Sequence, residues 1–303
     1  MKMEVHSRKI IFITGITGFT GKHLEEYYSK RGFGVYGTTF TEPSSSNHFK
    51  CDILEEEELF KILNKVKPEY IIHLAAISFV AAKDQKNIYN VNIFGTLSLL
   101  NAVTKLDYLP TKILIASSAA VYGNIEGELG EELCPQPVNH YGNSKLVMEN
   151  MVKGYYDRLN IIIVRPFNYT GTGQENHFLI PKIVSHYKEN KKEIELGNIN
   201  VYREFNDVHY VVKCYTELLF SKFKSDIFNV CSGNAININY ILSVMNQLAG
   251  YAIKVNVNPK FVRKNEIDIL KGNPRKLFAH IGDFTNEFTF NNTLEHMYNE
   301  NRI

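Results

Sequence analysis

Several features are scarce in this 303-residue sequence, and each absence excludes a class of protein. The formal net charge is only +2, so no strong field for binding nucleic acid or another polyanion is expected. No apolar run in the sequence is long enough to cross a membrane. The start, MKMEVHSRKIIFITG, lacks the apolar segment and small-residue cleavage site of a signal peptide, so we expect a cytoplasmic protein.

Cysteine is scarce as well, and its spacing is uninformative. The four cysteines are scattered and form no CxxC pair; they are Cys51, Cys134, Cys214 and Cys231. A reduced, metal-free protein is the simplest interpretation. Cys231 lies in an apolar, strand-like run, and we expect it to serve core packing.

The first half of the sequence alternates short apolar runs with longer amphipathic runs. We expect strands at 9–15, 34–40, 50–54, 70–76, 112–118 and 160–168, and helices at 21–32, 55–68, 87–106 and 141–159. This alternation is typical of a doubly wound α/β fold with a parallel sheet. Because the strands are continuously apolar, we expect helices on both faces of the sheet.

The alternation breaks after Asn168. Residues 169–178 are loop-like, a helix starts near Pro181, and a late strand at 226–233 is expected to return to the sheet. Another helix is expected at 237–250. The sequence therefore predicts a large domain made of 1–168 plus 204–233, and a smaller α/β lobe made of 169–203 plus 234–303.

A glycine-rich segment follows the first expected strand. TGITGFTG places Gly15, Gly18 and Gly21 between that strand and a helix. Glycines permit a tight turn, and the helix N-terminus offers N–H groups and the positive end of its dipole to a pyrophosphate. A glycine motif alone is weak evidence, but the strand–turn–helix context supports dinucleotide binding.

The end of the second strand bears on the choice of cofactor. An acid there would bind the ribose 2′-hydroxyl of NAD, but this segment reads GTTFTEPSSS, with Glu42 a little beyond the strand end. Without the acid, a 2′-phosphate is not repelled, and Thr39, Thr41 and Ser44 could donate hydrogen bonds to it. No arginine marks a phosphate clamp. We expect NADP(H), with NAD(H) as the open alternative.

Asp52 has two interpretations. Its carboxylate could accept a hydrogen bond from the adenine amino group, or it could cap the helix that begins at the glutamate run 55–58.

The segment YGNSK supplies Tyr141 and Lys145, which share one face of a helix at i and i+4. A free tyrosine has a pKa of roughly 10 and is a poor acid–base group at neutral pH. A lysine ammonium beside it favours the phenolate and lowers that pKa. Tyr141 could then exchange a proton with an alcohol oxygen, and Ser118, at a strand end, would hydrogen-bond the same oxygen.

Six segments occur in the order typical of one family: TGITGFTG, HLAA, NVNIFGT, SSAAVYG, YGNSK and RPFN. The chain resembles the extended short-chain dehydrogenase/reductases over nearly its whole length. The resemblance implies that the larger domain is a Rossmann domain for NADP(H) and that the smaller lobe binds a nucleotide sugar. It also implies that Ser118, Tyr141 and Lys145 are catalytic. A homodimer is implied too, through the helices that carry Asn92 and Tyr141.

The resemblance further implies a set of residues that contact the cofactor. They are Gly15, Thr17, Gly18, Phe19, Thr20, Gly21, Thr39, Asp52, Ile53, Leu74, Ala75, Ala76, Ser78, Tyr141, Lys145 and Pro166.

Two C-terminal segments narrow the substrate class. VYREFNDVHYV is similar to the family's R-D-F-x-D-V segment, with Glu204 in place of the usual aspartate. VRKNEIDILKGNPRKL resembles a segment of GDP-mannose 4,6-dehydratases and GDP-4-keto-6-deoxy-mannose reductases, although Lys264 and Asn273 depart from the pattern. RPFNYTGTGQ is close to the same subgroup. A GDP-linked sugar is therefore the expected substrate.

In this comparison Arg203 would face the substrate diphosphate, because the arginine fork suits phosphate oxygens. Arg263 would bind phosphate, Glu266 the guanosine, and Asn168 the sugar or its phosphates. The expected substrate contacts are Ser78, Ser118, Asn168, Lys182, Arg203, Arg263 and Glu266.

The residues after Ser118 bear on the reaction. Dehydratases of this family carry an acid–base pair there, whereas this chain has Ala119 and Ala120, which cannot move a proton. GDP-fucose synthases place a cysteine where Ala120 stands, and His177 is out of register with their partner histidine. Dehydration and 3,5-epimerisation are therefore disfavoured.

Two reactions need only the serine, tyrosine and lysine. One is reduction of a 4-keto sugar by NADPH, and the other is 4-epimerisation with bound NAD, whose enzymes usually have an acid at the second strand end. We expect reduction of the C4 keto group of a GDP-linked 4-keto-6-deoxy hexose or heptose in glycan precursor biosynthesis. A nucleotide-sugar 4-epimerase, a 4,6-dehydratase and a non-catalytic dinucleotide-sensing protein stay open as alternatives.

Overall fold

The computed structural model describes residues 9–78, 84–261 and 267–300. The chain divides into two compact units, which are considered separately below. The first consists of Met1–Val121, Pro137–Val164 and Tyr215–Ile227, and the second of Tyr122–Gln136, Arg165–Cys214 and Phe228–Ile303. Which unit binds the cofactor and which the nucleotide sugar stays a prediction, as do the boundaries 1–168 plus 204–233 and 169–203 plus 234–303.

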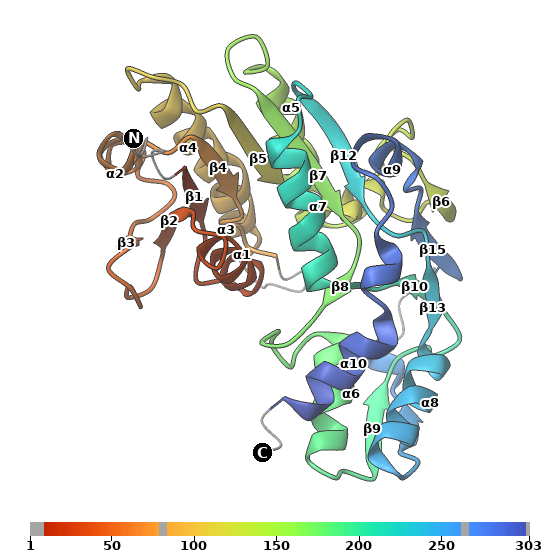
Figure 1. The fold of residues 1–303 in the computed structure, drawn as a ribbon. Coiled ribbons are helices and arrows are strands. Elements are labelled where there is room, and N and C mark those ends of the chain that lie inside the picture. The colour runs from red at the N-terminus through yellow and green to blue at the C-terminus, as the bar shows by residue number, and fades with distance from the viewer. Residues whose placement is uncertain (1–8, 79–83, 262–266, 301–303) are drawn as a thin grey trace. The chain divides into compact units, whose positions relative to one another are not determined.

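A seven-stranded sheet forms the framework of the first unit, in the order β12-β7-β5-β4-β1-β2-β3 (Figure 1). Its strands are β1 (Ile10–Thr14), β2 (Gly34–Thr39), β3 (His48–Lys50), β4 (Tyr70–His73), β5 (Lys112–Ala116), β7 (Ile161–Pro166) and β12 (Asp226–Val230). β1 pairs in parallel with β2 and with β4, so the strand order reverses at β1. This Rossmann-like order confirms the predicted fold class.

The helices that connect these strands follow the expected amphipathic runs. They are α1 (Phe19–Ser29), α2 (Glu56–Val66), α3 (Gln85–Tyr89), α4 (Gly95–Thr104) and α5 (His140–Lys153). Between α3 and α4 lies one turn of π-helix, η1 (Asn90–Phe94), and a short 3₁₀ turn, η2 (Ala119–Tyr122), follows β5. The continuous helix predicted at 87–106 is therefore interrupted by a wider turn.

The short strand predicted at 50–54 was misplaced. The strand β3 ends at Lys50, and residues 51–54 form a turn. In that turn the Asp52 side chain accepts a hydrogen bond from Leu54 N at 3.0 Å, and its carbonyl accepts one from Glu55 N at 3.0 Å. An aspartate that bonds its own neighbouring backbone competes with strand pairing.

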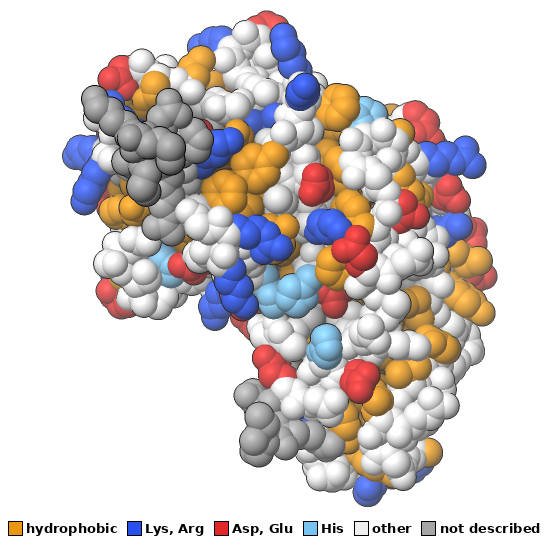
Figure 2. Space-filling view, viewed as in Figure 1, with side chains coloured by type: hydrophobic (Ala, Val, Ile, Leu, Met, Phe, Trp, Pro, Cys, Tyr) orange, Lys and Arg blue, Asp and Glu red, His pale blue; other side chains and the backbone are white. Residues whose placement is uncertain are grey.

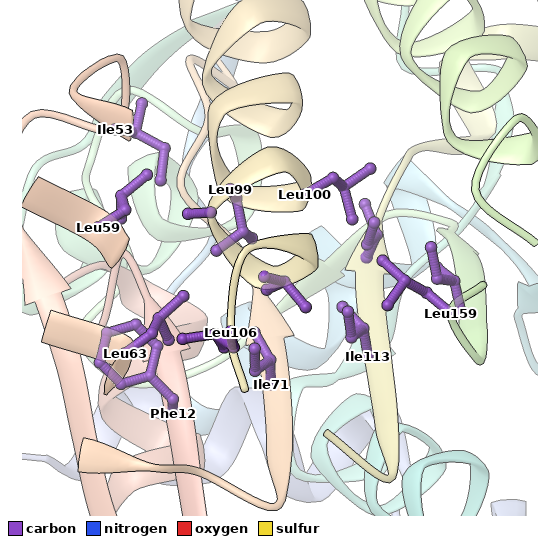
Figure 3. Close-up of a cluster of buried hydrophobic side chains, with 14 of the residues drawn as sticks. Phe12, Ile53, Leu59, Leu63, Ile71, Leu99, Leu100, Leu106, Ile113 and Leu159 are labelled. Carbon is purple, nitrogen blue, oxygen red and sulfur yellow. The ribbon is translucent and has the colours of Figure 1, made fainter. Parts of the chain in front are cut away.

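One face of the sheet carries a large apolar core (Figure 3). Phe12, Ile71 and Ile113, from three neighbouring strands, are at most 1% exposed and point toward the helices. Leu63 of α2 and Leu99 of α4 are fully buried against them. Each such side chain contributes roughly 1.5–3 kcal/mol through burial, so this layer holds the ends of the strands in place.

Aromatic side chains dominate the opposite face. Phe220, at the end of α7 (Val208–Phe220), stacks on Phe33 at 5.4 Å and meets the edge of Tyr70 at 4.9 Å between ring centroids. Tyr28 of α1 is fully buried beside them and accepts a hydrogen bond from Thr216 at 3.0 Å. Both faces of the parallel sheet are therefore covered, as its continuously apolar strands require.

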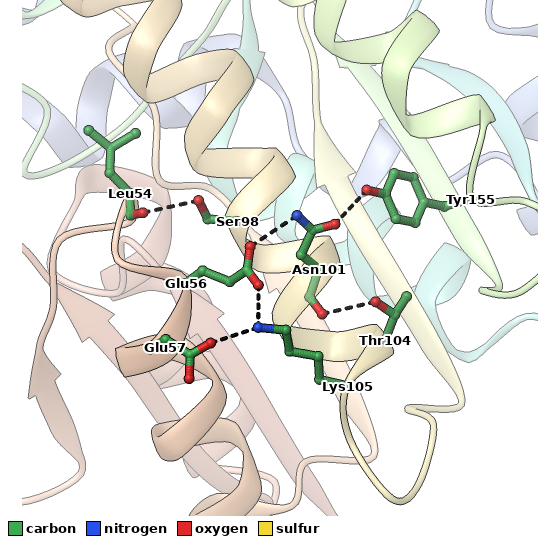
Figure 4. Close-up of polar contacts among 8 residues, drawn as sticks. All are labelled: Leu54, Glu56, Glu57, Ser98, Asn101, Thr104, Lys105 and Tyr155. Carbon is green, nitrogen blue, oxygen red and sulfur yellow. Dashed lines mark hydrogen bonds and ion pairs between the residues drawn. The ribbon is translucent and has the colours of Figure 1, made fainter.

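Polar contacts fasten α2 to α4 at the rim of this unit (Figure 4). Lys105 Nζ lies 2.6 Å from Glu56 Oε1 and 2.6 Å from Glu57 Oε1. Asn101 donates to Glu56 at 3.0 Å and accepts from the Tyr155 hydroxyl at 2.8 Å. Because Lys105 is largely exposed, solvent screens these ion pairs, and the apolar layer beneath them contributes more to stability.

The second unit contains one four-stranded sheet and two short two-stranded sheets. Its strands are β6 (Gly127–Leu129), β8 (Tyr169–Thr170), β9 (Glu193–Leu196), β10 (Tyr202–Glu204), β11 (Asn206–Asp207), β13 (Ala235–Asn237), β14 (Lys254–Val257) and β15 (Ile269–Gly272). Its helices are α6 (Leu179–Lys188), α8 (Ile238–Ala249), α9 (Arg275–Ile281) and α10 (Phe290–Asn299), with 3₁₀ turns η3 (Pro259–Phe261) and η4 (Thr285–Glu287). α7 begins in this unit.

Cys231 is fully buried in the second unit, as expected for a packing residue. Burial raises the pKa of its thiol well above the ordinary value, so the thiol stays protonated.

Acidic and basic side chains are interspersed over the face shown in Figure 2. Among the described residues, none of the helices has the length and apolarity needed to span a bilayer.

Candidate active site

The glycine loop joins β1 to α1, at the point where the strand order reverses. Gly15 has a φ of 73°, and a Cβ there would lie 3.0 Å from Ala75 N. A Cβ on Gly21 would lie 2.5 Å from Gly15 O. The loop is therefore closed by contacts that only glycine allows. Ligands of open α/β sheets bind at such a reversal, outside the carboxyl ends of the strands.

The loop geometry fits a pyrophosphate at the start of α1. Gly15 N and Ile16 N both donate to Thr38 O, at 3.0 and 3.1 Å, which fixes the turn. Gly18 is the N-cap of α1 and makes no side-chain capping hydrogen bond. The N-cap position of α1 thus carries no side chain, which favours the close approach of a phosphate group to the helix N-terminus.

Three threonine hydroxyls gather at the end of β2. Thr39 Oγ1 lies 2.8 Å from Thr17 Oγ1 and 3.0 Å from Thr41 Oγ1. Glu42, the nearest acid beyond the strand, forms an ion pair with Lys50. Ser44 Oγ lies 3.1 Å from His48 Nδ1, so this hydroxyl is directed at the histidine. The strand end therefore presents hydroxyls in the position where an acid would bind NAD.

A chain of buried polar groups connects the ends of β1 and β4. Thr14 Oγ1 accepts hydrogen bonds from Leu74 N and Ala75 N, both at 3.2 Å, so its own proton goes to His73 Nδ1 at 2.7 Å. His73 Nε2 then donates to Thr96 Oγ1 at 2.9 Å. His73 is neutral in this arrangement. Burial, and to a lesser degree the charge of Lys145, lowers the pKa of its imidazole to about 3.

The same chain continues to the helix that carries Tyr141. Thr96 donates to Asn92 O at 2.8 Å, and the Asn92 side chain donates to Ser144 Oγ at 3.0 Å. Asn92 Oδ1 also accepts from Ile77 N at 2.8 Å. Ser144 donates to Tyr141 O at 2.7 Å. The π-helical turn η1 places Asn92 between the segment after β4 and α5. The loop expected to line the cofactor is therefore coupled to α5.

Ser118 lies just after β5 and its orientation is fixed. Its Oγ accepts a hydrogen bond from Ala120 N at 3.1 Å, and its carbonyl accepts one from Val121 N at 3.2 Å. Within the described residues, its hydroxyl proton takes part in no other hydrogen bond. The serine therefore keeps a donor for a carbonyl oxygen.

Gly142 brings α5 against the serine turn. A Cβ on this residue would lie 2.5 Å from Ala120 O. Asn139 caps the helix by accepting from Gly142 N at 2.8 Å. The glycine in YGNSK thus permits a close approach between the start of α5 and the turn that holds Ser118.

Tyr141 and Lys145 are both buried, at 9% and 5% exposure. Lys145 Nζ donates to Ala116 O at 2.8 Å, at the end of β5. Burial lowers the pKa of Lys145 to about 8, against the charge of Glu149, which raises it. The three predicted catalytic residues therefore lie in one region of the first unit, with Ser118 between β5 and η2 and with Tyr141 and Lys145 on α5.

The other predicted cofactor contacts lie on the same unit, with one exception. Thr17, Phe19 and Thr20 belong to the glycine loop and the start of α1, while Ala76 and Ser78 follow β4. Ile53 is 7% exposed and packs in the apolar core. Pro166 ends β7 and falls in the second unit.

The predicted substrate contacts lie mostly in the second unit. Asn168 Nδ2 donates to Glu204 O at 3.1 Å, and Arg203 donates to Tyr202 O at 2.8 Å. Lys182 Nζ donates to Glu195 O at 2.7 Å. Arg263 and Glu266 lie outside the described residues. The substrate roles of this group stay predictions.

Glu204 is a buried carboxylate, which the sequence analysis noted only because it stands in place of the family's usual aspartate. Its oxygens accept hydrogen bonds from Gly272 N at 2.8 Å, from Asn206 Nδ2 at 2.9 Å and from Ser232 N. Burial raises its pKa, while these donors oppose the rise. Glu204 therefore holds β10, with its neighbour Arg203, against β15 and the segment after β12.

Sequence reasoning also missed His73, Thr96 and the partner of Ser117. His73 lies in HLAA and Thr96 in NVNIFGT, so both motifs were noticed without their polar side chains being connected. Ser117 donates to Glu149 Oε1 at 2.5 Å. The sequence signal that could have revealed these residues is a polar side chain at a position where the apolar pattern of the strand or helix predicts burial.

Comparison with known proteins identifies the family of the chain. A sequence model of the family described as GDP-mannose 4,6 dehydratase matches residues 12–297. The chain is 35% identical to GDP-6-deoxy-D-talose 4-dehydrogenase of Aggregatibacter actinomycetemcomitans, over 97% of this chain and 98% of that protein. It is 30% identical to GDP-6-deoxy-D-mannose reductase of Pseudomonas aeruginosa, over 90% of both chains.

A solved structure shares the fold. That of RMD from Pseudomonas aeruginosa, complexed with NADPH, has a TM-score of 0.85 and 27% identity, and the match covers 96% of this chain and 98% of that one. The fold and the site define an extended short-chain dehydrogenase/reductase, an oxidoreductase-type enzyme of a nicotinamide-dependent family. Within that class, the chain belongs to the family described as GDP-mannose 4,6 dehydratase.

The neutral state of His73 predicts a pH dependence of stability. Its pKa is about 3 in the folded protein, against roughly 6.5 when unfolded, so below pH 6.5 the unfolded chain binds the extra proton. The contribution of His73 to the free energy of unfolding is therefore greatest above about pH 7 and decreases as the pH falls toward 3. Between pH 7.5 and 5 the free energy of unfolding should drop by about 2 kcal/mol on this account.

Urea unfolding at several pH values measures this dependence. The slope of the unfolding free energy against pH gives the number of protons taken up on unfolding. Between pH 5 and 6.5, His73→Gln should lower this number by about one, whereas the same change at the exposed His296 should not. Equal slopes in wild type and His73→Gln would contradict the buried neutral imidazole.

Proposed function

We propose that the protein reduces the C4 keto group of a GDP-linked 4-keto-6-deoxy sugar with NADPH. The observation that carries the proposal is the set of Ser118, Tyr141 and Lys145 on neighbouring elements of one unit, with alanines at positions 119 and 120. This set can donate protons to a carbonyl oxygen, but the two positions directly after the serine carry no acid or base. NADPH, when bound, supplies the hydride.

Each residue has a distinct role in this proposal. Ser118 donates its hydroxyl proton to the sugar carbonyl oxygen and polarises it. Tyr141 donates a second hydrogen bond and transfers its proton to that oxygen as negative charge develops there. Lys145 retains ammonium protons beyond the one that bonds Ala116 O, and its charge stabilises the phenolate that Tyr141 becomes.

The alanines argue against water elimination. A dehydratase must remove a proton from one sugar carbon and protonate a leaving hydroxyl on the next, which needs an acid–base pair near the catalytic serine. Ala119 and Ala120 occupy η2, directly after Ser118, and neither can titrate. Reduction at one carbon needs no such pair, so the site as built favours reduction.

The two curated relatives support the same conclusion. One is named as a 4-dehydrogenase and the other as a reductase, and both names specify GDP-linked 6-deoxy sugars. Both identities reach 30% over at least nine-tenths of this chain. We therefore carry over the GDP-sugar class and hydride exchange at C4, as a proposal for glycan precursor biosynthesis. Whether the sugar is a hexose or a heptose stays open.

We propose NADPH over NADH because of the hydroxyl cluster at the end of β2. Thr17, Thr39 and Thr41 offer hydrogen-bond donors and no negative charge. The only nearby acid of this segment, Glu42, is neutralised by Lys50. An acid at this position is what NAD-binding sites use for the 2′-hydroxyl, and it would repel a 2′-phosphate.

We propose that Arg203 contacts the substrate diphosphate and that Asn168 and Lys182 make further contacts with the substrate. From sequence alone, Arg263 is predicted to bind phosphate and Glu266 the guanosine. Arg203 is held by backbone acceptors at Tyr202 and Asp268, which orient its guanidinium.

A second copy of the chain is proposed to pack on η1 and α5. Phe94 and Val147 are apolar but 53% and 47% exposed on these two elements. Removing such side chains from water favours association. The cytoplasmic location expected from the sequence stays a prediction.

Tyr141→Phe tests the reductase assignment. The variant loses the transferable proton but keeps the ring, so turnover of NADPH with a GDP-4-keto-6-deoxy sugar should fall by about 10²–10⁴-fold while GDP binding is retained. Tyr155→Phe, which removes a hydroxyl that bonds Asn101 at the helix rim, is the matched control and should keep full activity. Full activity of Tyr141→Phe would rule out the assignment.

Thr41→Asp tests the cofactor proposal. Thr41 is exposed, so an aspartate fits there, and its charge should repel the 2′-phosphate. The ratio of kcat/KM for NADPH to that for NADH should fall by about 10-fold or more. Thr41→Asn separates charge from size: an equal fall in this neutral variant, or no fall in Thr41→Asp, would contradict the proposal.

Val147→Glu tests the homodimer. A charge on the proposed interface should convert dimers to monomers in light scattering, whereas the same change at the exposed Val138, outside both helices, should leave the mass unchanged. A wild-type protein that is monomeric at high concentration would refute the proposal.

A further inference from the structure

Glu149 is a buried carboxylate with no role in the function proposed above. It lies on α5, four residues after Lys145 and eight after Tyr141, so all three share one face of the helix. Its exposure is 0% and that of Lys145 is 5%. Burying a carboxylate is costly unless it is paired or hydrogen-bonded, so a partner for its charge is required.

This carboxylate accepts a hydrogen bond from a serine whose own backbone is held in place. Ser117 Oγ donates to Glu149 Oε1 at 2.5 Å, and Ser117 N donates to Val164 O at 2.7 Å, which fixes the serine at the end of β5. Ser117 is therefore turned toward Glu149 while the adjacent Ser118 serves the candidate active site. Within the same buried face of α5, the nearest cation along the helix is Lys145.

The charge of Lys145 is opposed by its burial. Loss of water around the ammonium lowers its pKa to about 8, and Glu149 is the group that counteracts this. From β4, the imidazole of His73 is neutral, so it adds no second positive charge beside the ammonium. Without a carboxylate on this face, the amine would lose its proton at a lower pH.

Three further polar groups on or beside α5 supply no negative charge to this balance. Asn92 of η1 and Ser144 are neutral and bond each other at 3.0 Å. His140 is exposed at the start of the helix, where its Nδ1 lies 3.0 Å from the Tyr89 hydroxyl of α3. Among the groups named here, the acidic side chain that shares the buried face of α5 with Lys145 is Glu149.

We propose that Glu149 is a positioning residue that keeps Lys145 protonated at neutral pH, with Ser117 holding the carboxylate in place. For its catalytic consequence, the inference rests on the proposed function, because the ammonium is what stabilises the phenolate of Tyr141. Glu149 itself does not contact the reacting atoms in this account. It acts through Lys145, so the state of that amine is the quantity to measure.

NMR titration of lysines labelled at Cε measures the Lys145 pKa directly, and Lys145→Met assigns the signal by removing it. In Glu149→Gln, which keeps the shape but not the charge, the pKa should fall by about one unit or more. Glu149→Asp, which restores the charge, should return it most of the way to the wild-type value. Ser117→Ala should give a smaller fall in the same direction.

Several outcomes would overturn the inference. A Lys145 pKa that is unchanged in both Glu149→Gln and Ser117→Ala would show that the carboxylate does not hold the proton. A wild-type Lys145 that is already neutral at pH 7 would also overturn the inference. This measurement needs no variant, so it applies even if Glu149→Gln fails to fold. An equal fall in Glu149→Asp and Glu149→Gln would indicate a packing role alone.

The titration needs no substrate, so it is independent of the proposed reductase activity. If wild type shows the expected pKa pattern but does not turn over NADPH, the proposed function fails and the inference stands. If turnover is found, Glu149→Gln should also shift the pH profile of kcat in the same direction as the Lys145 pKa.

Discussion

The structure of the candidate site depends on one buried chain of hydrogen bonds, which runs from Thr14 through His73 and Thr96 to Asn92 and on to Ser144. It joins the end of β1, the segment after β4, the π-helical turn and α5. Each group in the chain is both donor and acceptor, so a protonated His73 would break it. Burial enforces the neutral imidazole. A half-satisfied network of this kind would be worse than an apolar one, so its members are strongly interdependent.

Local patterns in the sequence predicted the strands, the glycine loop and the catalytic spacing. Apolar runs such as IIFIT specify a buried strand by themselves, and the i, i+4 spacing of Tyr141 and Lys145 places both on one helix face. The π-helical turn at Asn90–Phe94 could not be predicted, because it arises from tertiary contacts of Asn92 rather than from local propensity. For the same reason, the partners of Ser117 and Glu204 lie 32 and up to 68 residues away and leave no spacing signal.

Two features of the sequence determine the surroundings of Ser118. Gly142 allows α5 to approach the serine turn, and Ala119 and Ala120 place no titrating side chain at the two positions directly after Ser118. The first places the tyrosine and lysine, and the second limits what they can do. In the proposed reaction, a hydride is delivered to one carbonyl carbon and a proton to its oxygen. On the buried side of α5, Glu149 and Ser117 extend the site by one further layer that acts on the charge of Lys145.

The central claim is that this site reduces a 4-keto sugar linked to GDP. The most direct measurement mixes the protein with NADPH and GDP-4-keto-6-deoxy-mannose and follows the absorbance of the reduced cofactor, with the sugar product identified by NMR. The account predicts loss of one NADPH for each GDP-6-deoxy sugar formed. Interconversion of C4 hydroxyl epimers without net oxidation of the cofactor, or release of water from GDP-mannose, would contradict it.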